Sequence, residues 1–317
     1  MDSKTQIDKL HSSVQALVDY KRRFRPDFHG SYMEVTALMS QIVADIADCE
    51  NTGVSSETLV EIVAPARQIQ AESPFVKRLQ EWPRGYAGDF ETVEYLMDQR
   101  NQAPKDTLAW YVEMHTLGTM VAQQHRNKVN HQAELILRNA LNHEGHQRKI
   151  LLIASGGAPD LRIVAAHIAN ADCRFVLNDI DINALEFARS KLGVLTDKCV
   201  FLQGNILACM SSIAAQGPFD LILAGGLFDY LNDRAAQVLL KGVFKKFCAP
   251  QSLFYFSNLA VGNPYRCWME YLATWNLISR DEAAIQNMLK PFESEIADVT
   301  LTRDATGLTI LTHVRTK

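Results

Sequence analysis

The stretch that most constrains this chain of 317 residues is KILLIASGGAPD, residues 149–160. Residues 150–154 have the length and β-branched content of a strand buried on both faces, as strands of parallel sheets are. Gly156 and Gly157 follow, where the backbone must turn tightly and let a ligand come close. From Asp160 onward, apolar residues recur at helical spacing. The pattern predicts the first strand, turn and helix N-terminus of a nucleotide-binding α/β domain.

An acidic residue ends the second predicted strand, residues 173–178. Asp179 lies roughly 20 residues past the glycines, where it can accept hydrogen bonds from both hydroxyls of a ribose. This favours an adenosine-containing cofactor. The full Gly-x-Gly-x-x-Gly pattern of dinucleotide sites is absent, because Ser155, Gly157 and Asp160 stand at its positions. A carboxylate at Asp160 is unfavourable for a pyrophosphate but acceptable for a cofactor with a sulfonium and an amino acid.

Four motifs occur along the chain in the same order as in class I S-adenosylmethionine-dependent methyltransferases, which they resemble. They lie at residues 150–160, 178–181, 204–206 and 219–226. Three more segments resemble a bacterial branch described as 3-hydroxypalmitic acid methyl ester biosynthesis methyltransferases, and they are residues 84–92, 226–231 and 268–280. The resemblance implies an α/β fold with a Rossmann-like, seven-stranded sheet and a terminal antiparallel hairpin. It also implies S-adenosyl-L-methionine as the cofactor.

The resemblance further implies a set of cofactor-binding residues: Tyr86, Arg126, Ser155, Gly156, Gly157, Asp179, Ile180, Asn205, Ile206, Ala224 and Gly225. Arg126 falls where the family tends to have an arginine near the carboxylate of the cofactor. Asn205 stands where such enzymes commonly carry an aspartate that accepts from the adenine amino group. An asparagine can accept through its carbonyl oxygen, so this departure is compatible with binding.

Two domains are expected. Helical patterns over residues 3–20, 32–49, 57–79, 91–99 and 107–142 predict an all-helical domain at 1–145, followed by a Rossmann-like domain at 146–317 that ends in a β-hairpin, 295–302 and 308–314. Residues 142–146 contain two histidines and a glutamate. We interpret them as the junction rather than a metal site, because a third anchored ligand is lacking.

The loop at residues 82–90 combines a proline, two glycines and aromatic residues, and it is costly to order unless it packs against something. We expect it to cover the cofactor or substrate and to present Tyr86 and Asp89. Alternatively, Asp89 is the N-cap of the helix that follows. His115 is another candidate base, although a helix with several histidines is more often partly exposed surface.

The catalytic candidates are Asp229, Tyr230, Asp89 and His115. Ligands of open α/β sheets lie over the carboxyl ends of the strands, which places Asp229 and Tyr230 beside the transferred methyl group. The alternative for these two is a helix cap and a packing aromatic. Substrate-binding candidates follow the fifth strand, because aromatics with one fixed cation suit an acceptor that joins an apolar body to a carboxylate: Tyr265, Arg266, Trp268 and Glu270. Core packing is the alternative for Trp268.

Composition limits the partners. A net charge of −4 argues against nucleic acid. Hydrophobic runs of membrane-spanning length and an apolar signal core are both lacking, so no membrane insertion and a cytoplasmic location are expected. The six cysteines lack metal-ligand spacing and are expected to be reduced thiols, with no metal bound.

The sequence thus predicts an enzyme that transfers a methyl group from S-adenosylmethionine to a small molecule. The preferred acceptor is a carboxylate or hydroxyl oxygen, for example of a 3-hydroxy fatty acid. A carboxylate needs no general base, whereas a hydroxyl or an amine would use one. Three alternatives stay open: an N-methyltransferase in natural-product biosynthesis, an NAD-dependent oxidoreductase, and a non-catalytic methyltransferase-like subunit. A homodimer is also left open.

Overall fold

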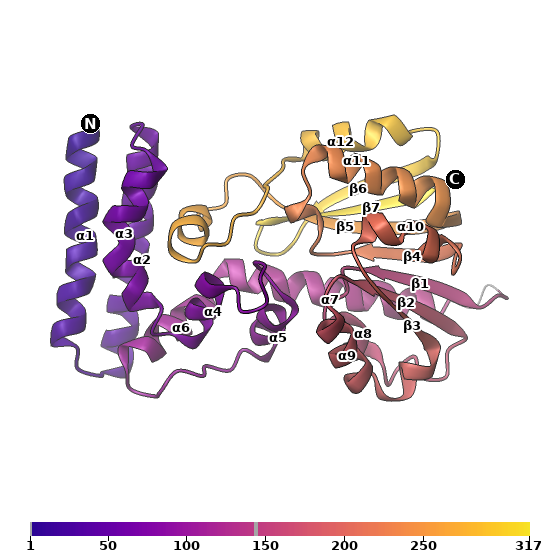
Figure 1. Ribbon diagram of the computed structural model, residues 1–317, viewed down its shortest axis with the longest axis horizontal. Helices are drawn as coiled ribbons and strands as arrows, with labels where there is room; N and C mark the ends of the chain where they lie inside the picture. The colour runs from indigo at the N-terminus through magenta and orange to yellow at the C-terminus, as the bar shows by residue number, and fades with distance from the viewer. Residues whose placement is uncertain (1, 143–144) are drawn as a thin grey trace. The chain divides into compact units, whose positions relative to one another are not determined.

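The structure is a computed structural model that describes residues 2–142 and 145–317 (Figure 1). The chain folds into two compact units, Met1–Gln123 with Asn263–Asn276, and Gln124–Gly262 with Leu277–Lys317. We call them the helical unit and the sheet unit. Of the expected junction at 142–146, His143 and Glu144 lie outside the described residues. The division into domains at 145/146 stays a prediction.

The helical unit consists of short and medium helices, several of which begin at a side chain that accepts a backbone N–H. Its helices are α1 (Ser3–Arg23), α2 (Phe28–Asn51), α3 (Ser56–Gln70), α4 (Pro74–Glu81), α5 (Phe90–Asp98), α6 (Leu108–Gly118), the start of α7 (Met120–Ala140), and a π-helical turn η4 (Trp268–Leu272). The caps are Asp2, Asp27, Ser55, Ser73, Asp89 and Thr107.

Two of the expected helices are interrupted, so those predictions were wrong in length. The helix expected over 57–79 breaks because Ser73 caps a new helix that starts at Pro74, whose ring carries no N–H to continue the earlier one. The helix expected over 107–142 breaks at Thr119, which has extended backbone angles after Gly118.

One buried carboxylate joins three of these helices. Glu113 of α6 is fully buried and accepts four hydrogen bonds. The donors are the hydroxyl of Ser73 at 2.8 Å, the amide of Phe75 at 3.1 Å, the hydroxyl of Tyr95 at 2.5 Å and the amide of Gln102 at 2.6 Å. A carboxylate has about four acceptor positions, so this one is fully used in holding the helical unit together.

The sheet unit is built on seven strands in the order β3-β2-β1-β4-β5-β7-β6 (Figure 1). The strands are β1 (Arg148–Ile153), β2 (Cys173–Asp179), β3 (Cys199–Gln203), β4 (Phe219–Ala224), β5 (Cys248–Leu259), β6 (Ile296–Arg303) and β7 (Thr309–Thr316). The first five are parallel, and β7 runs antiparallel to both β5 and β6. The expected seven-stranded α/β sheet with a terminal hairpin is confirmed.

Helices cover both faces of this sheet, as the two separate cores show. The helical elements are the rest of α7, α8 (Pro159–Val164), α9 (Ile182–Lys191), η1 (Gly193–Lys198), α10 (Ile206–Ala214), η2 (Phe228–Tyr230), α11 (Asp233–Gly242), η3 (Val243–Phe247), α12 (Glu282–Leu289) and η5 (Lys290–Phe292). Ile150 and Leu152 of β1 pack with α7, α8 and α9, whereas Leu151 and Ile153 pack with α10, α11 and α12. The period-two alternation of a strand produces this separation.

Candidate active site

The turn after β1 is strained and held in place. Ala154, Gly156 and Ala158 all have positive φ, at 51°, 53° and 50°. Such angles are unfavourable for alanine, so surrounding contacts must maintain them. The amide of Ser155 donates to the carbonyl of Asn178 at 3.0 Å, and the amide of Gly156 donates to Oδ2 of Asp179 at 2.7 Å. The end of β2 thus fixes the shape of the turn.

Asp179 connects the turn after β1 to the end of β2. It is 7% exposed, and its Oδ1 also accepts from the amide of Asp181 at 2.9 Å. Burial raises the pKa of the Asp179 carboxyl, and the backbone N–H donors oppose this shift. Two of its acceptor positions remain for hydroxyl groups. The next side chain, Ile180, is 57% exposed and offers an apolar surface beside it.

The other expected cofactor positions of the sheet unit lie at the same edge, because the carboxyl ends of parallel strands coincide. Asn205 follows β3 and caps α10 by accepting from the amide of Leu207 at 2.9 Å, while Ile206 is buried. Ala224 is the last residue of β4 and Gly225 follows it, and the Gly225 carbonyl accepts from the hydroxyl of Ser257 at 2.6 Å. The strands therefore bring this part of the predicted set together.

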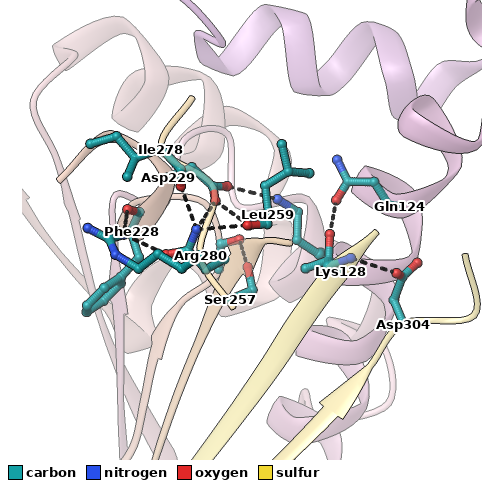
Figure 2. A network of polar contacts seen from close by, with 12 residues as sticks. Gln124, Lys128, Phe228, Asp229, Ser257, Leu259, Ile278, Arg280 and Asp304 are labelled. Carbon is teal, nitrogen blue, oxygen red and sulfur yellow. Dashed lines mark hydrogen bonds and ion pairs between the residues drawn. The ribbon is translucent and has the colours of Figure 1, made fainter. Parts of the chain in front are cut away.

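Asp229, a predicted catalytic residue, lies in a buried polar network in the sheet unit (Figure 2). Its Oδ1 accepts from the amide of Leu259 at 2.6 Å and from Nδ2 of Asn258 at 3.1 Å. Its Oδ2 lies 3.5 Å from Nζ of Lys128, and its carbonyl accepts from the amide of Ile278 at 2.8 Å. These contacts connect the loop after β4 to the end of β5. They give Asp229 a structural role, and a catalytic one stays a prediction.

Arg280 belongs to the same network. It lies just after residues 263–276, the segment that belongs to the helical unit. Its guanidinium donates to the carbonyls of Phe228 at 2.8 Å and Leu231 at 2.6 Å, and to Oδ1 of Asn258 at 2.6 Å. Figure 2 shows Arg280 beside Phe228, Asp229 and Leu259. The loop that carries Tyr230, itself 41% exposed, is therefore held on both sides.

Three predicted residues belong to the helical unit. Asp89 is buried, caps α5 through the amide of Thr92 at 2.9 Å, and receives two contacts from Arg78 at 2.6 and 2.7 Å. The N-cap interpretation of Asp89 is confirmed. His115 shares a hydrogen bond of 3.0 Å with Thr36, and burial lowers its pKa to about 4, so it is neutral at pH 7. Tyr86 is half-buried in its loop.

The predicted substrate residues also belong to the helical unit. The guanidinium of Arg266 pairs with Glu50, and its Nη1 contacts Glu270 at 2.7 Å. Trp268 is buried and donates to Oε1 of Gln70 at 2.9 Å, while Tyr265 is half-buried. These contacts favour the packing interpretation for Trp268 and leave Arg266 neutralised by two carboxylates. A substrate role for the four residues stays a prediction.

Sequence reasoning missed a polar stripe on α7, formed by Gln124, Lys128 and Gln132. They are spaced by four residues and are 0%, 3% and 8% exposed. Arg126 on the same helix was predicted and is buried too, which lowers the pKa of its guanidinium. Polar residues at helical spacing resemble a solvated face. One signal in the sequence could have found these residues. A helix that precedes the first strand of such a sheet is expected to pack on it with an apolar face, and this face is polar.

Two histidines of the sheet unit share a hydrogen bond. Nε2 of His131 on α7 lies 2.7 Å from Nε2 of His313 on β7, and the ring of Tyr255 is 5.3 Å from each. Burial lowers the pKa of both imidazoles, that of His313 to about 4. The pair is therefore neutral at pH 7.

We expect the stability of the sheet unit to fall as the pH is lowered from 6.5 towards 4. In that window the unfolded chain binds protons that the folded pair does not, at up to about 1.4 kcal/mol per pH unit for each group. Urea unfolding followed by circular dichroism at pH 7, 6 and 5 measures this. His313→Gln should flatten the dependence, whereas His11→Gln, at an exposed position, should not. An equal slope in both variants contradicts the assignment.

The six cysteines are free thiols. Across residues 2–142 and 145–317, three His, Cys, Asp or Glu side chains nowhere gather in a way that could bind a metal ion. Within the same ranges, the helices are all too short or too polar to span a bilayer.

Neither a protein-family model nor a curated protein matches the chain. A possible exported protein from Bordetella parapertussis is similar over 99% of this chain and 97% of its own, at 13% identity and a TM-score of 0.58. The N-methyltransferase NodS from Bradyrhizobium japonicum, in complex with S-adenosyl-L-homocysteine, matches 59% of this chain and 86% of its own, at 16% identity and a TM-score of 0.41.

The O-methyltransferase TomG from Streptomyces achromogenes, in complex with S-adenosylmethionine, matches 73% of this chain and 91% of its own, at 14% identity and a TM-score of 0.43. At identities this low, a structural match concerns the fold alone. In this chain, five parallel strands in the order 3-2-1-4-5 continue into β7, which is antiparallel and lies between β5 and β6. The fold is that of class I methyltransferases.

Proposed function

We propose that this chain is an S-adenosylmethionine-dependent methyltransferase that acts on a small molecule. One observation carries the proposal: the turn after β1 is hydrogen-bonded to the acidic residue at the end of β2, in a sheet with the methyltransferase strand order. The order reverses between β1 and β4, and ligands of open α/β sheets bind outside the carboxyl ends at that point.

The side chains at this edge fit such a cofactor. Asp179 has acceptor positions for two ribose hydroxyls, exposed Ile180 offers an apolar face for a flat base, and Asn205 has a carbonyl for an amino group. The hydroxyl oxygen of Ser155 is buried without a hydrogen-bond partner in the described part of the chain. Asp160, buried at the start of α8, disfavours the pyrophosphate of NAD.

The protein's contribution is alignment and exclusion of water. When bound, S-adenosylmethionine supplies an electrophilic methyl group on a sulfonium. The rigid loop after β4, held by Asp229 and Arg280, defines where an acceptor can approach. We favour an oxygen acceptor, a carboxylate or hydroxyl such as that of a 3-hydroxy fatty acid. An amine acceptor is the alternative, and a hydroxyl or an amine would use a general base, for which Asp229 is the candidate within the sheet unit.

Isothermal titration of the purified protein with S-adenosylmethionine, S-adenosylhomocysteine and NAD tests the proposal. We expect micromolar binding of the two sulfur nucleosides and none of NAD. Binding of NAD alone would favour an oxidoreductase. Binding of none of the three would favour a non-catalytic methyltransferase-like subunit, and either result overturns the proposal.

A further inference from the structure

The polar stripe on α7 crosses the edge of the sheet where an acceptor would approach. Gln124 meets β7, because the hydroxyl of Thr309 donates to its Oε1 at 2.5 Å. Lys128 meets the loop after β4 at Asp229. Gln132 lies so close to Gly225 that a side chain there would come within 2.2 Å of the amide group. From the next residue onward the same helix presents an apolar face, with Ala133, Ile136 and Ala140 in the core.

The donors of this stripe are incompletely used. The Lys128 ammonium has three N–H groups, and within the described residues its single acceptor is Oδ2 of Asp229, at the outer limit of a hydrogen bond, 3.5 Å. Nε2 of Gln124, one turn away, is buried with no partner in the same ranges. A buried donor without an acceptor costs free energy, so a polar group that accepts hydrogen bonds from both Lys128 and Gln124 is favoured there.

The local charge selects the sign of that group. Lys128 and Arg126 are buried within one turn of each other, and burial together with their positive charges lowers the pKa of the preceding residue, His125. The nearest carboxylate, Asp229, already accepts from Leu259 and Asn258. Unused N–H donors beside a positive charge suit a carboxylate, which accepts at both oxygens.

We propose that Lys128, with Gln124, binds a carboxylate of the ligand at this edge. The inference rests on the proposed function. Two sources share this chemistry, the amino-acid end of the cofactor and the acceptor. The contacts of the pair lie with the loop after β4 and with the start of β7, whereas Asp179 ends β2 on the other side of β1 in the strand order. This position favours the acceptor, so the acceptor is a carboxylic acid.

Calorimetry on the full chain separates the sources. S-adenosylhomocysteine and methylthioadenosine, which lacks the amino-acid end, are titrated first. 3-Hydroxydecanoate and its methyl ester are then titrated into protein saturated with S-adenosylhomocysteine. Lys128→Met should weaken binding of the acid about tenfold or more and leave the ester unchanged, because only the acid is held by a charge-assisted hydrogen bond. Lys128→Arg should retain most of the affinity.

The other outcomes are equally specific. Weaker binding of S-adenosylhomocysteine to Lys128→Met, with methylthioadenosine unchanged, supports the carboxylate site and assigns it to the cofactor. Lys241→Met, at an exposed position of α11, is the matched control and should equal the wild type. The inference is overturned if Lys128→Met equals the wild type toward all these ligands, whether or not the acid binds. If the wild type binds neither nucleoside, the proposed function itself fails.

Discussion

Asp229→Ala is expected to lower the free energy of unfolding of the sheet unit by about 3–5 kcal/mol, the cost of breaking a buried charge pair from one side. The substitution leaves the ammonium of Lys128 without its carboxylate. It also removes the acceptor of the Leu259 amide and one of the acceptors of the Asn258 side chain, all in a buried region. The carboxylate accepts from three donors on two segments, α7 and the end of β5, and an alanine methyl group accepts from none of them.

The placement of the tryptophans makes this measurable. Trp82, Trp110, Trp268 and Trp275 all belong to the helical unit, whereas circular dichroism at 222 nm reports helices of both units. In urea, Asp229→Ala should shift the circular dichroism transition, and the tryptophan transition should follow only if the units unfold together. Asp233→Ala, which removes an exposed carboxylate paired with Arg280 at 2.9 Å, should cost under about 1 kcal/mol. Equal stability of Asp229→Ala and the wild type contradicts the structural role.

That result also bears on the chemistry. A general base needs a lone pair that points to the acceptor. Oδ1 of Asp229 is used by two neutral donors, and Oδ2 faces the Lys128 ammonium. If Asp229→Asn binds the cofactor normally and loses methyl transfer more than stability, the catalytic prediction gains support. If the losses run in parallel, Asp229 acts by holding the loop.

The parts of the fold that could be predicted from the sequence are those with short-range signals. The first strand with its glycine turn and each strand of the terminal hairpin are marked by apolar runs, alternation and turn residues that lie close together in the sequence. The N-cap role of Asp89 was also readable, since the helix begins beside it. Helix lengths were not, because Ser73 and Thr119 start new helices inside long apolar patterns.

The site was harder to predict from the sequence, because its contacts join segments that are far apart in the chain. Arg266 looked like a free cation for a substrate, yet its partner Glu50 is 216 residues away in sequence. An aromatic stripe has the same spacing whether it packs in a core or lines a pocket, so the position of Trp268 was ambiguous. Gln124 and Lys128 looked like surface, and only the folded chain brings Thr309 and Asp229 to them.

Asp179→Ala is expected to weaken binding of S-adenosylhomocysteine about 100-fold. Two ribose hydroxyls that donate to a carboxylate contribute about 1.5 kcal/mol each, and 2.8 kcal/mol corresponds to that factor. Because burial raises the pKa of this carboxyl, the affinity of the wild type should also fall on acidification at a higher pH than an ordinary aspartate would cause. Titration calorimetry over a pH series measures both effects.

The control variant separates ribose binding from the shape of the turn. Asp179 also accepts from the amide of Gly156, so its loss could act by releasing the strained turn. Asp179→Asn keeps an oxygen for that amide but loses the charge. It should recover the turn and only part of the affinity. Asp181→Ala, which removes the cap of α9, leaves both oxygens of Asp179 in place and should bind within a few-fold of the wild type. Normal affinity in Asp179→Ala would mean that the adenosine lies elsewhere, and equal losses in Asp179→Ala and Asp181→Ala would mean that the edge of the sheet, rather than one carboxylate, was disrupted.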